Sequence, residues 1–91
     1  MNITDVIVRK VTREDRLKAI VSITIDDCFA IHDIKVIEGD KGTFIAMPSR
    51  KCSDGGYRDV CHPINQATRD MLQIIILAKY EEVMAGETDE T

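Results

Sequence analysis

A cluster of basic residues lies within the segment AMPSRKCSDGGYRDVCHPIN, residues 46–65. Arg50, Lys51 and Arg58 belong to it, and only two aspartates oppose them. Cationic side chains in a glycine-containing loop can contact phosphate groups, with backbone N–H groups helping. A solvated polar loop is the alternative, because charged loops are common on protein surfaces. The segment therefore gives a candidate nucleic-acid-binding site at Arg50, Lys51 and Arg58.

The same segment ends in Cys61 and His62, a pair that could supply a thiolate and its base. Neighbours on an extended chain point to opposite faces, so we do not expect these side chains to meet. Structural zinc sites use two closely spaced ligand pairs, and only Cys28 and His32 have such a spacing. We therefore predict no metal site and no cofactor, and we interpret Cys61 as small apolar filling.

Sequence motifs of common enzyme classes are missing. The chain has no GxGxxG, GxxxxGK[ST], HExxH or GxSxG. The carboxylates beside the basic cluster, Asp54 and Asp59, have no visible acid–base partner. The sequence thus predicts a protein that is not an enzyme, has no catalytic residues and takes no small-molecule substrate.

Composition indicates one globular domain. The chain has 91 residues, of which 44% are hydrophobic and 31% charged. No apolar run approaches the ~20 residues that a membrane span needs, and the N-terminus does not resemble a signal peptide. Three cysteines, an odd number, fit reduced thiols better than a disulfide framework. We expect a cytoplasmic protein with no membrane contact.

Charge is distributed unevenly along the chain. The net charge is −4, but residues 81–91 hold five acids and no base, which leaves 12 − 11 = +1 for residues 1–80. Residues 41–58 contain four bases and one acid, a net charge of +3. An acidic total argues against strong non-specific binding to polyanions, but a local basic patch can still make such a site.

Alternation of apolar and polar residues predicts strands in the first half of the chain. The pattern is clearest at residues 17–25, where one face is wholly apolar. We expect further strands at 3–10, 29–37 and 43–47, turns at 12–16, 26–27 and 38–42, a loop at 48–56, and a brief fifth strand at 57–61.

One helix is predicted after these strands, with Asn65 as N-cap and Gly86 as the stop. Its three- and four-residue spacing gives a stripe for packing: Thr68, Met71, Leu72, Ile75, Ile76, Lys79 and Val83. The predicted fold is α+β: a small antiparallel meander of four to five strands with one C-terminal helix on its apolar face. Residues 1–86 form the domain, and residues 87–91 form an acidic tail that we expect to be disordered.

Three segments resemble the SpoVG family of small bacterial proteins: FAIHDIKVIEG (29–39), FIAMPSRK (44–51) and YRDVCHPIN (57–65). The resemblance extends over about residues 1–84. It implies a homodimeric, site-specific DNA-binding regulator of gene expression, with RNA as a further partner. It also implies a role in asymmetric septation during sporulation, or in cell division.

The resemblance also implies which positions bind nucleic acid, namely Arg50, Lys51 and Arg58. The chain departs from the family in its Arg-Lys order, since Lys-Arg is common there, and a bidentate donor thus moves by one position. Cys28, Cys52 and Cys61 stand where the family usually has residues without a thiol, which favours an interpretation of all three as apolar filling.

Two further expectations concern partners. A meander ends in edge strands with unpaired N–H and C=O groups, and a small domain has little core, so we predict a homodimer through edge strands. The alternative function is a protein-interaction module of the division or sporulation machinery whose contact with nucleic acid is incidental.

Overall fold

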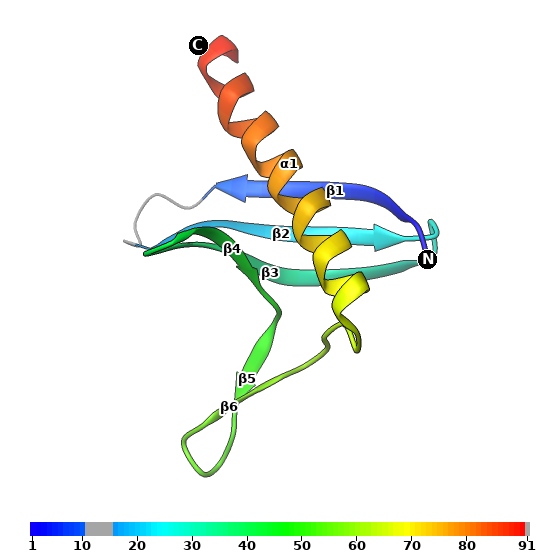
Figure 1. Cartoon of the computed structure of the whole chain (residues 1–91), viewed down its shortest axis with the longest axis vertical. Coiled ribbons are helices and arrows are strands. Elements are labelled where there is room, and N and C mark those ends of the chain that lie inside the picture. The colour runs from blue at the N-terminus through cyan, green and yellow to red at the C-terminus, as the bar shows by residue number, and fades with distance from the viewer. Residues whose placement is uncertain (11–15, 91) are drawn as a thin grey trace.

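A computed structural model describes residues 1–10 and 16–90, which form a four-stranded sheet, a separate pair of strands and one helix (Figure 1). The elements are β1 (Ile3–Lys10), β2 (Leu17–Ile25), β3 (Phe29–Gly39), β4 (Gly42–Ala46), β5 (Ser49–Lys51), β6 (Tyr57–Asp59) and α1 (Gln66–Glu90). The predicted α+β class is confirmed. No helix in the described part of the chain has the length and apolar character needed to cross a membrane.

The four-stranded sheet is an antiparallel meander in the order β1-β2-β3-β4. β1 and β2 have the predicted bounds, whereas β3 and β4 extend further into their turn. Gly39 pairs with Gly42, which leaves only two residues between the strands. Gly42 has a φ of 131°, a conformation that residues with a side chain rarely adopt. The turn predicted at 12–16 lies, apart from Arg16, outside the described residues.

α1 packs across one face of the meander, as predicted (Figure 1). Alternation in β2 and β3 directs one set of side chains to this face, and Leu72 and Ile76 of α1 meet them. Ile76 is fully buried, whereas Ile75, a member of the predicted stripe, is half-buried. The buried core consists of Ala19, Val21, Ile23, Ile34, Val36, Met47, Leu72 and Ile76.

The start of α1 is confirmed and its end is corrected. Asn65 is the N-cap, because its Oδ1 accepts a hydrogen bond of 2.8 Å from the backbone N–H of Thr68. The helix does not stop at Gly86 but continues to Glu90. Glycine inside a helix costs about 1 kcal/mol relative to alanine, which weakens a helix without having to end it. The division of the chain into a domain of residues 1–86 and a tail stays a prediction.

The prediction of a loop at 48–56 is wrong for the first half of this segment. Residues 49–51 form β5 and pair in antiparallel fashion with β6, which lies within the strand predicted at 57–61. The two strands do not join the meander as a fifth strand; they form a second sheet of their own. In Figure 1 this pair projects away from both the meander and α1.

The packing of α1 predicts opposite outcomes for two neighbouring isoleucines. Ile76→Asp would bury a carboxylate with no partner, which costs several kcal/mol, and the variant should be largely unfolded in a thermal melt followed by circular dichroism. Ile74→Asp, at a position that is 69% exposed, makes the same change in the same helix and should keep a cooperative melt. Native melting of the Ile76 variant would contradict the docking of α1.

Candidate nucleic-acid interface

The three candidate cations lie on the hairpin of residues 48–60, here called the basic ribbon. Its register pairs Ser49 with Asp59, Arg50 with Arg58 and Lys51 with Tyr57. Backbone hydrogen bonds extend this ladder at both ends. Val60 N–H donates to the carbonyl oxygen of Pro48 at 2.8 Å, and Cys52 N–H donates to that of Gly56 at 2.7 Å. The ribbon is therefore a continuously bonded hairpin, which fixes its side chains relative to one another.

A three-residue turn, Ser53 to Gly55, closes the tip of the ribbon. Gly55 N–H donates to the carbonyl oxygen of Cys52 at 3.0 Å, and Gly55 has a φ of 91°. The carboxylate of Asp54 accepts a hydrogen bond of 2.9 Å from the N–H of Gly56. Short loops that end in a glycine with positive φ are a common way to close a hairpin. Gly55 thus helps to build a defined turn at the tip of the ribbon.

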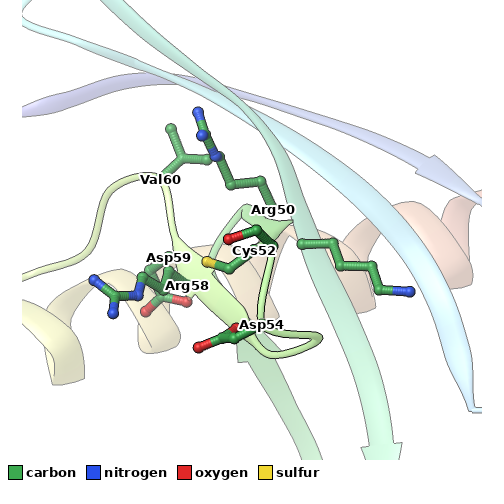
Figure 2. Close-up of a pocket in the computed structure, with 8 residues that line it drawn as sticks. Arg50, Cys52, Asp54, Arg58, Asp59 and Val60 are labelled. Carbon is green, nitrogen blue, oxygen red and sulfur yellow. The ribbon is translucent and has the colours of Figure 1, made fainter.

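The register determines which face of the ribbon each cation occupies. Arg50 and Arg58 are directly opposite each other, so both side chains leave the same face. Lys51 is the next residue along β5 and therefore leaves the other face, opposite Tyr57. In Figure 2, Arg50 extends beside Val60, while the guanidinium of Arg58 points in another direction. The two guanidinium groups are thus spread apart on their shared face.

None of the three cations has a partner among the residues that the structure describes. All three are exposed, and the ion pairs of the described residues join other groups: Arg16 with Asp40, Lys18 with Glu38, and Lys79 with Glu82. Charged groups directly opposite each other with the same sign destabilise a strand pair. Arg50 and Arg58 therefore carry an electrostatic cost in the free protein that a bound anion would relieve.

A hollow of about 630 Å³ lies against the basic ribbon, and all three cations line it (Figure 2). Asp54 and Asp59 line it as well, and Cys52 contributes a half-buried thiol. The surroundings are polar and cationic, so they suit an anionic group such as a phosphate better than an apolar ligand.

The cysteine and histidine residues are not gathered into a site. Cys61 is half-buried against the core, as apolar filling predicts, but Cys28 is exposed and does not fit that interpretation. His62 donates from Nδ1 to the carbonyl oxygen of Pro63 at 3.0 Å, and His32 Nδ1 lies 2.9 Å from the hydroxyl of Ser22. Within the described ranges, no three His, Cys, Asp or Glu side chains converge as metal ligands.

The sequence predicted the three cations but not their pairing. Arg50 and Arg58 are each four residues from Asp54, so a hairpin centred on the Ser-Asp-Gly turn places them opposite each other. That symmetry was the available signal. It was missed because residues 48–56 have the composition of a loop and β5 is only three residues long.

Comparison with known proteins places the chain in a family. The SpoVG family model matches residues 1–82. The chain belongs to the SpoVG family. A SpoVG relative from Lachnospira eligens is 68% identical over 82 residues, which are 90% of this chain and 93% of that protein. One from Caldicellulosiruptor bescii is 60% identical over 88 residues, 96% of this chain and 100% of its own length. Both carry the name "Putative septation protein SpoVG".

The repulsion between Arg50 and Arg58 predicts a gain in stability on mutation. Arg58→Glu places opposite charges across the ladder and should raise the free energy of unfolding by about 0.2–1 kcal/mol in a urea titration. Arg58→Gln, which removes the repulsion without adding an attraction, should give a smaller increase. A clear loss of stability in both variants would show that Arg58 makes stabilising contacts in the folded protein.

Proposed function

We propose that this SpoVG protein is a cytoplasmic nucleic-acid-binding regulator that contacts DNA through the basic ribbon. Three exposed cations on one projecting hairpin, with no ion-pair partner among the described residues, support this proposal. Phosphate contacts supply most of the affinity of proteins for nucleic acids, and they require cations that can reach the backbone. RNA offers the same phosphates, so binding to RNA is part of the proposal. No catalytic step is assigned.

The acidic end of the chain does not neutralise the basic ribbon in this proposal. The ribbon and the C-terminal end of α1 lie at opposite ends of the molecule, whose longest dimension is 45 Å (Figure 1). Charges in physiological salt are screened over about 8 Å. The local positive potential at the ribbon therefore survives in a protein whose net charge is −4.

The cellular role that we propose is septation, the process in the names of the relatives. Regulation of gene expression at asymmetric septation or cell division would join that role to binding of DNA. The alternative, a protein-interaction module in the same machinery, is favoured by a different observation. A groove of about 480 Å³ lies between β1 and α1, and the apolar side chains of Ile3, Val6, Ile74 and Ile75 line much of it.

We also propose that the protein is a homodimer that pairs through an edge of the meander, with β1 as the edge. At the other edge, Gln73 Oε1 accepts a hydrogen bond of 3.5 Å from Ile45 N–H, which occupies a donor of β4. At β1, Asp5 accepts a 2.9 Å hydrogen bond from Val6 N–H, and this local bond would open on pairing. The apolar groove beside β1 would add buried surface.

Dimerisation is tested by light scattering at micromolar concentration. The expected mass is twice the 10.2 kDa of the chain. Ile74→Glu in the groove beside β1 should shift the protein toward the monomer mass without unfolding it. Wild-type protein at the monomer mass would contradict the dimer.

Salt dependence tests the proposed binding site. If each ribbon cation contacts one phosphate of a random-sequence duplex, the logarithm of affinity should fall with the logarithm of salt at about −0.9 per contact, or roughly −5 for a dimer. Arg50→Ala/Lys51→Ala should flatten this slope by about 3.6, because a dimer loses four contacts. Fluorescence anisotropy at several salt concentrations gives both slopes.

Lys41→Ala is the matched control for the salt titration. It removes one cation from the turn between β3 and β4, outside the ribbon, and should leave the slope unchanged. Equal slopes and affinities for wild type and the Arg50/Lys51 variant would refute the ribbon as the binding site. If wild type binds no duplex at low salt, the interaction-module alternative is favoured.

A further inference from the structure

The dimensions of the basic ribbon match a groove of duplex DNA. Two paired strands lie about 4.8 Å apart, and the major groove of B-form DNA is about 12 Å wide, which admits a two-stranded ribbon. β5 and β6 pack mainly against each other, and Figure 1 shows the ribbon extending clear of the meander and α1. The base of the ribbon, at Ser49 and Val60, shares a hollow with residues of β2 and β3, so its tip is the part that extends away from the sheet.

The shape of one ribbon face favours close approach to bases. Beyond Arg50 and Arg58 toward the tip, the next pair on the same face is Cys52 and Gly56, joined by the 2.7 Å backbone hydrogen bond. Cysteine has a small side chain and glycine has none, so little protrudes from this part of the face. The two guanidinium groups are therefore the most protruding donors on this face near the tip.

The chemistry of this face is suited to guanine. A guanidinium group presents a planar fork of N–H donors that matches the O6 and N7 acceptors of guanine in the major groove. Cross-strand neighbours have Cα atoms about 5 Å apart, and stacked bases are about 3.4 Å apart. Arg50 and Arg58 can therefore reach two base pairs that are adjacent or that have one base pair between them. Their spread in Figure 2 fits two separate acceptors.

The other face of the ribbon has a different composition. Lys51 and Tyr57 are neighbours there, and Tyr57 is 72% exposed. An ammonium group is a point charge that suits a phosphate oxygen and lacks the fork needed to identify a base. The register thus places the two arginines on one face and the lysine on the other, although all three cations border the hollow beside the ribbon.

We infer that the basic ribbon enters the major groove of B-form DNA with Arg50 and Arg58 toward the bases, where they read two nearby guanines, while Lys51 contacts the backbone. On random sequence the two arginines rest on phosphates, and on the preferred sequence they turn to guanine. This inference rests on the proposed function. It adds the ligand class, a guanine-containing B-form duplex, and it assigns sequence reading to the pair of arginines.

Selection from a DNA pool tests the reading of guanine. Duplexes of about two helical turns (~20 base pairs) with a randomised centre are incubated with the protein, and the retained fraction is sequenced. Wild type should enrich two guanines that are adjacent or one base apart on a strand. Arg50→Lys/Arg58→Lys keeps the charge but loses the fork, so the preference for the enriched sequence over the unselected pool should fall at least about tenfold.

The outcomes of this selection separate the inference from the function beneath it. If the Arg→Lys variant keeps the wild-type preference, or if wild type enriches no guanines, the inference is wrong while binding to DNA stands. If wild type retains no duplex at low salt, the proposed function fails, and the inference fails with it.

Double-stranded RNA provides an independent test. The major groove of A-form RNA is deep and narrow and does not admit side chains. An RNA duplex with the enriched sequence should therefore compete about tenfold or more weakly than the DNA duplex in the anisotropy assay. Equal competition would show that the ribbon recognises phosphates without entering a groove, and would overturn the inference.

Discussion

Burial of Leu72 and Ile76 against β2 and β3 is the interaction on which the rest of the structure depends. It joins α1 to the meander. Along the chain, the ribbon lies between these two parts, because it follows β4 and precedes α1. Both ends of the ribbon are thus held by one core. A two-stranded hairpin is marginally stable by itself in water, so this anchoring is a physical requirement for a ribbon that buries little of its own surface.

The anchoring has a consequence for electrostatics. Because the core holds the ends of the ribbon, its side chains need not pack, and its cations can remain exposed with no partner in the described chain. The repulsion between Arg50 and Arg58 is then a local cost that the core can tolerate. Groups that lower stability but remain available to a ligand are expected at functional sites, where activity and stability compete. The ribbon combines this cost with a register that separates the arginine pair from Lys51.

Much of the fold could be predicted because its signals are local. Strict alternation over residues 17–25 fixed the buried face of β2, and Asn65 marked the start of α1. The same patterns could not separate Ile75 from Ile76, because the angle at which α1 crosses the sheet decides which of them is buried. The predicted end of α1 at Gly86 was wrong because a glycine weakens a helix without having to end it. The observed helix continues to Glu90.

The candidate site divides in the same way. Residue type and proximity in sequence were enough to select Arg50, Lys51 and Arg58 as a group. Their arrangement was not predictable from composition, because it follows from the pairing of two three-residue strands whose hydrogen bonds form only once the turn at Asp54 is closed. The family resemblance, now confirmed over residues 1–82, implied which three positions to consider but gave no geometry for them.

The claim that the basic ribbon is the surface that meets nucleic acid is tested most directly by NMR. Backbone amide shifts of the labelled protein are recorded during titration with a random-sequence DNA duplex. The account predicts shifts concentrated at residues 49–59, with the amides of the buried core of β2 and β3 unchanged. Shifts confined to α1 or to the uncovered face of the meander, with the ribbon amides unmoved, would contradict it.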